Sequence, residues 1–199
     1  FYENDRISSV LLAYQGGMEG GSAIAALLAG KANPCGKLPD TFARDLDDYP
    51  STEHFHDSTD YVEYAEDVYV GYRYFETLPG AAERVCYPFG FGLSYTRFAL
   101  EVLEAGAENG IIQIRTQVTN TGDRAGKEVV QLYFCPPKGR LQKPSRNLTA
   151  FRKTGLLGPG ESETVTLSFA VSDMASFDDL GKIAPSAWVL EKGRYDLYL

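Results

Sequence analysis

The chain has 199 residues, of which 44% are hydrophobic, and its formal net charge is -8. This composition is typical of a globular protein that can bury one sizeable core or two modest ones, and it excludes a disordered chain. The 27 Asp and Glu against 19 Lys and Arg argue against a nucleic-acid partner or an anionic membrane surface, because phosphate binding requires a clustered positive field. No apolar run approaches the roughly 20 residues that cross a bilayer.

Three cysteines, Cys35, Cys86 and Cys135, lie far apart in the sequence. An odd number leaves at least one without an intrachain partner, which favours a reducing compartment. We therefore expect a cytoplasmic protein, and the first residues do not resemble a secretion signal. The chain starts without Met and both its ends resemble strands, so we expect it to be part of a longer polypeptide.

The first elements expected are a strand and a helix joined by a glycine-rich turn. Ile7–Tyr14 is a short, largely apolar run of the kind found in strands covered on both faces. Ser22 can cap a helix that runs to about Leu28, and Gly30 supplies its end. Strand, turn and helix in this order form the unit of a parallel α/β sheet. Residues 1–96 are therefore predicted to hold the end of a mostly parallel sheet, with an extended linker.

The glycine-rich turn, Gln15–Gly21, is the first candidate ligand site. Ligands of parallel sheets bind beyond the carboxyl ends of the strands, and this turn follows such an end. Gln15, Met18 and Glu19 are therefore expected to border a ligand. A phosphate loop is the alternative, but no Lys-Ser/Thr pair follows the glycines, and their spacing is not that of a dinucleotide fingerprint.

Residues 44–67 form an acidic, irregular segment that holds the only histidines, His54 and His56. Two histidines spaced by one residue in an extended segment point the same way, and Asp57 is adjacent, so a metal site is one hypothesis. A pair of glycosidase carboxylates is another, but no pair is singled out, and sequence does not give the separation of about 5 to 9 Å that such a pair needs. Solvated charge explains the segment better. We expect a surface loop over a neighbouring domain, and no metal or cofactor.

The next candidate site lies in Val68–Phe75, which is dense in β-formers and predicts a strand. In a strand, Tyr72 and Tyr74 would share one face and Arg73 would take the other. An arginine between aromatic residues can bind a ligand carboxylate or a sugar hydroxyl, and it can equally stack and pair within the structure. All three residues are candidate substrate contacts.

The decapeptide Tyr87–Thr96 separates two kinds of structure. Its two glycines and its aromatic residues are typical of a tight, packed junction. Beyond it, five segments alternate or are rich in β-formers: 98–104, 111–120, 128–134, 163–169 and 194–199. This spacing predicts an all-β, immunoglobulin-like antiparallel sandwich over residues 97–199. Gly193-Arg194-Tyr195 resembles a tyrosine corner, and the strand that would complete the fold is expected to be missing.

Long stretches of the chain resemble glycoside hydrolase family three. AYQGGMEGGSAIAALLAGKANPCGKLPDTF (13–42), DVYVGYRYF (67–75) and YPFGFGLSYTRF (87–98) resemble the signatures of its C-terminal α/β domain. VTNTGDRAGKEVVQLYF (118–134) and AFRKTGLLGPGESETVTL (150–167) resemble its fibronectin type III-like domain. The sequence AYQGGMEGG, with the acidic segment after it, is most similar to a bacterial branch of the family whose domain order is permuted. In that branch these two domains precede the barrel.

The resemblance implies retaining hydrolysis of β-glucosides or related β-glycosides, with a β-glucoside or oligosaccharide as substrate. In the family the nucleophile belongs to a (β/α)8 barrel and the acid/base glutamate to a loop upstream of this match, so no catalytic residue is assigned here. The barrel of the same protein is the expected partner, and this chain is expected to supply a pocket wall and a structural sandwich. Glu19 is expected to hold its turn or border the pocket rather than protonate a substrate.

A second hypothesis is that the chain works alone, as a carbohydrate-binding or protein-interaction module without catalysis. Tyr72, Tyr74 and the Phe89–Phe91 pair would then form an aromatic platform. Tight pairing of the chain with a separate barrel domain would favour the first hypothesis. We favour the glycosidase fragment.

Overall fold

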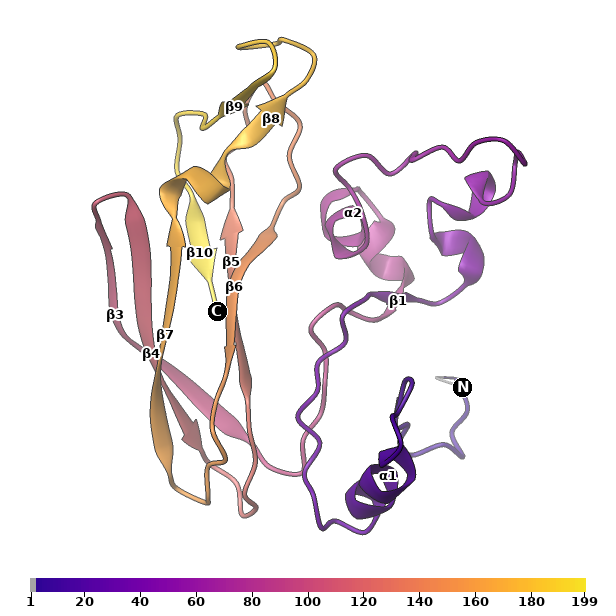
Figure 1. The fold of residues 1–199 in the computed structure, drawn as a ribbon, viewed down its shortest axis with the longest axis vertical. Coiled ribbons are helices and arrows are strands. Elements are labelled where there is room, and N and C mark those ends of the chain that lie inside the picture. The colour runs from indigo at the N-terminus through magenta and orange to yellow at the C-terminus, as the bar shows by residue number, and fades with distance from the viewer. Residues whose placement is uncertain (1–2) are drawn as a thin grey trace.

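Two parts lie side by side in the computed structural model, which describes residues 3–199 (Figure 1). The first part holds α1 (Gly20–Leu28), β1 (Phe42–Ala43), η1 (Leu46–Asp48), η2 (Thr52–His54), α2 (Tyr72–Thr77), η3 (Ala81–Arg84) and β2 (Val85–Tyr87). The second holds β3 (Phe98–Glu108), β4 (Ile111–Asn120), β5 (Val129–Cys135), β6 (Asn147–Lys153), β7 (Ser162–Ala170), η4 (Val171–Met174), β8 (Ser176–Asp178), β9 (Ala187–Val189) and β10 (Asp196–Tyr198).

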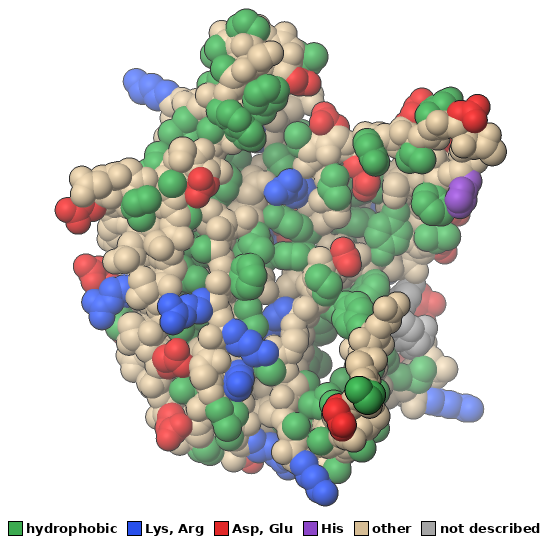
Figure 2. Space-filling model, in the orientation of Figure 1, with side chains coloured by type: hydrophobic (Ala, Val, Ile, Leu, Met, Phe, Trp, Pro, Cys, Tyr) green, Lys and Arg blue, Asp and Glu red, His purple; other side chains and the backbone are tan. Residues whose placement is uncertain are grey.

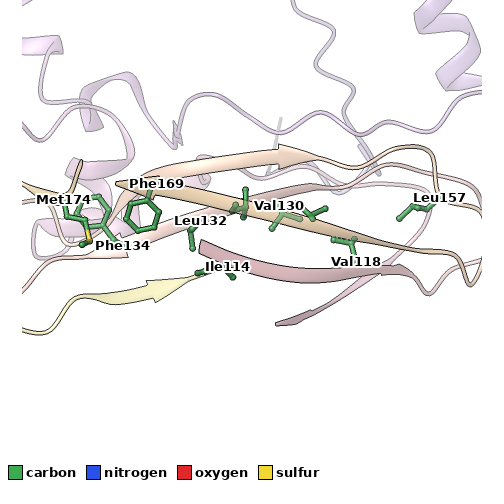
Figure 3. Close-up of a cluster of buried hydrophobic side chains, with 10 residues drawn as sticks. Ile114, Val118, Val130, Leu132, Phe134, Leu157, Phe169 and Met174 are labelled. Carbon is green, nitrogen blue, oxygen red and sulfur yellow. The ribbon is translucent and has the colours of Figure 1, made fainter. Parts of the chain in front are cut away.

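The second part is an antiparallel sandwich, as predicted. One sheet has the order β3-β4-β7 and the other β10-β5-β6. Along β4, Ile114, Thr116, Val118 and Asn120 are buried and alternate with more exposed residues, because successive side chains of a strand point to opposite faces. The inward residues of β4, β5 and β7 form one core, which Met174 and Leu157 extend (Figure 3).

The sandwich also confirms the tyrosine corner. The Tyr195 hydroxyl donates to the Glu191 carbonyl oxygen at 3.1 Å. β10 follows and pairs with β5 at one edge of its sheet. The other sheet ends at β3, whose Leu100 lies opposite the buried Val118 yet is 44% exposed. The missing last strand stays a prediction.

The predicted strand at Ile7–Tyr14 is wrong: within residues 3–199 this segment pairs with no strand. Its side chains are exposed, for example Val10 at 54% and Leu12 at 44%. A strand needs a neighbour for its backbone groups, and the chain that the structure describes supplies none here. The apolar run therefore marks a surface rather than a buried strand.

The end of helix α1 was predicted correctly, but its start was not. It starts at Gly20 with Glu19 as N-cap, so the predicted cap at Ser22 is wrong. Its end is as expected, because Gly30 has φ +67 and its N–H donates to the Leu27 carbonyl oxygen at 3.0 Å. Glycine adopts this left-handed conformation without a Cβ clash.

Helix α2 replaces the strand predicted over Val68–Phe75. The helix follows Gly71, which has φ 60, and it buries Phe75 to 1% exposure. Consecutive helical residues project about 100° apart, so Tyr72 and Tyr74 do not share a face as they would in a strand. The β-propensity of the aromatic residues misled the prediction, since tertiary packing overrides it here.

The decapeptide 87–96 forms the tight junction that its composition predicted. Gly90 N–H donates to the Leu38 carbonyl, and Leu38 N–H donates to the Phe91 carbonyl, both at 2.8 Å. A Cβ on Gly92 would collide with the Gly36 carbonyl oxygen, so only glycine fits there. Two segments distant in sequence therefore run side by side, and the decapeptide continues into the sandwich (Figure 1). In residues 3–199 no helix is both long and apolar enough to cross a membrane.

Candidate functional site

The glycine-rich turn before α1 presents its predicted residues to solvent. Gln15, Met18 and Glu19 are all exposed, and Met18 has no cover at 103%. The turn closes through a hydrogen bond from the Gly20 N–H to the Gly17 carbonyl at 2.9 Å. An amide, a thioether and a carboxylate are thus free to contact another molecule or domain.

Tyr72 has a different position, at the contact between α2 and the sandwich. Its ring stacks on Phe89 at 4.6 Å between centroids and meets Tyr133 edge-on at 6.2 Å. Its hydroxyl accepts a hydrogen bond from the Leu148 N–H of β6 at 2.8 Å. The ring and hydroxyl of Tyr72 thus help to hold the two parts together.

Of the four aromatic residues proposed as a platform, only Tyr72 and Phe89 pack against each other. Tyr74 meets Phe75 edge-on at 5.2 Å, and Phe91 tilts against Tyr87 at 5.4 Å. Together with the stacked Tyr72 and Phe89, these rings do not form one exposed plane, and none of the four predicted residues is fully exposed. The structure contradicts the predicted platform.

Arg73 lines a cleft of about 240 Å³, which we call the Arg73 cleft. Its walls are Pro39, Asp40, Val70, Gly71, Tyr72, Arg73 and Phe89. The Arg73 Nε is shut off from solvent and has no hydrogen-bond acceptor within residues 3–199. Its guanidinium carbon lies 5.9 Å from the Tyr72 ring centroid, near the outer limit of a cation–π contact. A buried donor without an acceptor costs about 1–3 kcal/mol or more when charged, so this placement requires an explanation.

The predicted site residues form two groups. Gln15, Met18 and Glu19 lie beside α1, whereas Tyr72, Arg73 and Tyr74 lie on α2 at the other end of the first part (Figure 1). Sequence analysis did not predict Asp40, and it named Phe89 only as part of the aromatic platform; both complete the Arg73 cleft. The only signal was their place in conspicuous turn segments, because the fold alone brings both segments to α2.

The acidic segment does not gather its histidines into one site. His54 lies at the end of η2 and its Nδ1 is 3.3 Å from Asp57 Oδ2. His56 has φ 71 and packs against Phe55, so the two rings do not extend from one strand as predicted. Among the described residues, no three His, Cys, Asp or Glu are grouped so that they could hold a metal ion.

Charged groups fix α2 against the sandwich. Arg146, the residue before β6, donates from Nε to Glu76 Oε2 at 2.6 Å. A second hydrogen bond joins Arg146 to the other carboxylate oxygen of Glu76. Arg146 also lies 5.2 Å from the Tyr133 ring centroid. Burial is the main cause that raises the pKa of Tyr133 to about 12, so its phenol stays neutral at physiological pH. Helix α2, which carries Arg73, is therefore attached to the sandwich by a bidentate ion pair.

A second joint ties α1 to the sandwich. The Asn33 amide donates to the Ala125 carbonyl at 3.0 Å and accepts from Ser94 Oγ and the Tyr95 N–H. Tyr95 Oη donates to the Leu27 carbonyl at the end of α1 at 3.0 Å. Both ends of the first part are thus attached to the sandwich, one through Asn33 and the other through Glu76.

Comparison with known families agrees with this architecture. Residues 1–95 match the glycosyl hydrolase family 3 C-terminal domain, and residues 128–199 match a fibronectin type III-like domain. β-Glucosidase A of Butyrivibrio fibrisolvens is 56% identical to the chain and aligns with 100% of it. The chain belongs to glycosyl hydrolase family 3.

Solved structures support the same assignment for this family 3 chain. A β-glucosidase of Paenibacillus barengoltzii is 50% identical with a TM-score of 0.87, over 92% of the chain and 20% of that protein. β-Glucosidase 3B of Thermotoga neapolitana, solved in complex with α-D-glucose, is 44% identical with a TM-score of 0.84, over 94% and 25%. The chain spans 26% of the Butyrivibrio enzyme. It therefore corresponds to a fifth to a quarter of these bacterial β-glucosidases, and its α/β segment and sandwich are those of family 3.

Proposed function

We propose that the polypeptide to which this chain belongs is a retaining β-glucosidase that removes terminal β-linked glucose from oligosaccharides or glucosides. One observation carries the proposal: two successive domains of family 3 cover most of the chain, and its relatives with 50% or more identity are β-glucosidases. The chain supplies a pocket wall and a supporting sandwich. It does not supply the nucleophile.

Retaining hydrolysis requires two carboxyl groups about 5–5.5 Å apart, one as nucleophile and one as acid and base. The family resemblance attributes the nucleophile to a barrel domain and the acid/base residue to a loop upstream of this match. Gln15 and Glu19 at one end of the first part, and Arg73 at its other end, serve instead as hydrogen-bonding groups for sugar hydroxyls at separate positions, while Met18 and Tyr74 offer apolar contact. Tyr72 offers its ring, and its hydroxyl, which accepts from the Leu148 N–H, can still donate a hydrogen bond.

The barrel domain is the proposed partner of the exposed apolar surface before α1. Ile7, Val10 and Leu12 are 43%, 54% and 44% exposed, and Leu28 of α1 is 71% exposed. Covering such side chains contributes about 25 cal/mol per Å² of apolar area removed from water. Adding a separately produced barrel domain to this chain should therefore give a stable complex, which analytical ultracentrifugation can detect.

The activity is tested on the whole polypeptide with an aryl β-glucoside, an aryl α-glucoside and an aryl β-xyloside. We expect hydrolysis of the β-glucoside above all, with the first-formed glucose retaining the β-configuration by proton NMR. The 199-residue chain alone should release no aglycone. Inversion of the anomeric centre, or activity on the α-glucoside alone, would refute the proposal.

We further propose that the enzyme is cytoplasmic. The support is that Cys35, Cys86 and Cys135 are all free thiols, as a reducing compartment would leave them. Fractionation of the source cell, with thiol labelling of the native protein, checks this. Recovery outside the cytoplasm with blocked thiols would contradict it.

A further inference from the structure

The Arg73 cleft holds one cation and one carboxylate that do not pair with each other. Arg73 and Asp40 both line it, and within residues 3–199 neither side chain forms an ion pair. The Asp40 carboxylate would repel an anionic ligand, and the Arg73 guanidinium would repel a cationic ligand. A neutral polyol suits both, because one hydroxyl can donate to the carboxylate while another accepts from the guanidinium.

The apolar part of the cleft fits the face of a sugar ring. Phe89 and Tyr72 line it with Val70 and Pro39. A pyranose presents C–H groups on its face and hydroxyls on its rim, so it matches a pocket with a largely apolar lining and a few polar groups. The volume of about 240 Å³ lies below the range of about 300–1,000 Å³ that drug-sized ligands occupy. One sugar ring is therefore the appropriate size.

The walls of the cleft are fixed before any ligand arrives. Tyr72 is stacked on Phe89 and its hydroxyl is bonded to the Leu148 N–H of the sandwich. The Arg73 Nε is shut off from solvent, so this part of the side chain is enclosed by the protein. A site whose groups are held in advance loses less conformational entropy on binding.

From these observations we propose that the Arg73 cleft is a binding site for a single glucopyranose ring, with Asp40 and Arg73 as its hydrogen-bonding pair. The choice of glucose among polyols rests on the proposed β-glucosidase function. The site is complete within this chain, so its affinity can be measured without the barrel domain.

The experiment titrates the 199-residue chain with D-glucose and cellobiose, using saturation-transfer NMR and calorimetry. We expect a millimolar dissociation constant, which is ordinary for a small polar ligand. Asp40→Asn and Arg73→Lys should each weaken glucose binding at least about tenfold, because each removes a charge-assisted or forked hydrogen bond. Asp47→Asn and Arg84→Lys make the same chemical changes at other sites of the first part and should leave the affinity within about twofold.

Circular dichroism of each variant separates loss of binding from loss of folding. Glucose binding that survives both Asp40→Asn and Arg73→Lys in folded protein would overturn the inference, as would the absence of any glucose binding. Sulfate or acetate binding that Asp40→Asn strengthens would make the cleft an anion site instead. A whole enzyme that hydrolyses β-glucosides while the chain binds no glucose refutes this inference alone. Glucose binding without β-glucosidase activity refutes only the proposed function.

Discussion

The two parts of the molecule differ in where their apolar side chains lie. In the sandwich, Val118, Leu132 and Val165 are 0% exposed, whereas among residues 3–97 only Phe75 and Ala81 are buried hydrophobic residues. The sandwich surface is not free of apolar side chains either, as the end that holds β8 and β9 shows (Figure 2). The charges differ as well: residues 1–96 carry 15 Asp and Glu against 6 Lys and Arg, and residues 97–199 carry 12 against 13. The sandwich therefore has a hydrophobic core of its own, while the first part has few buried hydrophobic residues and is attached to the sandwich.

Equivalent leucine substitutions in the two parts test this comparison most strongly. Leu132→Ala removes a fully buried side chain from the sandwich core and should lower the free energy of unfolding by about 2–5 kcal/mol, through lost burial and a cavity. Leu12→Ala, at a residue that is 44% exposed, should cost less than about 0.5 kcal/mol. Urea unfolding followed by circular dichroism measures both. Equal effects would contradict the proposed difference between the parts.

A buried ion pair inside the sandwich should have the next largest effect. Lys143 Nζ lies 2.5 Å from Glu191 Oε2, and their side chains are 6% and 11% exposed. Glu191→Gln leaves the buried ammonium without a counter-charge and should cost about 3 kcal/mol in urea unfolding. The control, Asp196→Asn, breaks the pair with Arg194, whose side chain is 87% exposed, and should cost about 0–1 kcal/mol. A small effect of Glu191→Gln would show that the local structure adapts to the loss.

The pH dependence of stability follows from the same carboxylate. Burial raises the pKa of Glu191, but Lys143 and the N–H groups of Arg140 and Leu141 outweigh it, so the pKa is lowered overall. A lowered pKa in the folded state contributes stability that is present above the unfolded value of about 4.3 and is lost as pH falls through the folded value. The difference in urea midpoint between wild type and Glu191→Gln should therefore shrink as the pH is lowered from neutral to strongly acidic. A difference that grows on acidification would have the wrong sign.

Sequence predicted the self-contained part far better than the dependent part. β4 was predicted correctly because Ile114, Thr116 and Val118 alternate with more exposed residues. The core that buries these three side chains lies within the chain itself. β6 was missed, because its seven residues show no clean alternation. Ile7–Tyr14 and Val68–Phe75 were assigned as strands from local composition alone, but neighbouring structure decides their conformation.

The same reason limits prediction of the candidate site. Arg73 could be singled out from its place between two tyrosines. Asp40 could not, and Phe89 was named only for the aromatic platform, because both reach α2 through the paired segments around Leu38 and Gly90. Residues that a fold assembles from three distant segments carry no local signal of their shared position.

The smallest predicted effect concerns the joint between the parts. Arg146→Lys loses the fork that binds both oxygens of Glu76, and because these side chains are 41% and 23% exposed, the loss should be about 1 kcal/mol. Hydrogen exchange should then be about fivefold faster for the amides of α2, while those of β4 and β5 keep their rates. Arg152→Lys changes an exposed arginine of β6, the strand that follows Arg146, and should alter neither. If β4 and β5 also exchange faster in Arg146→Lys, the two parts open as one unit, and the sandwich relies on α2 as much as α2 relies on the sandwich.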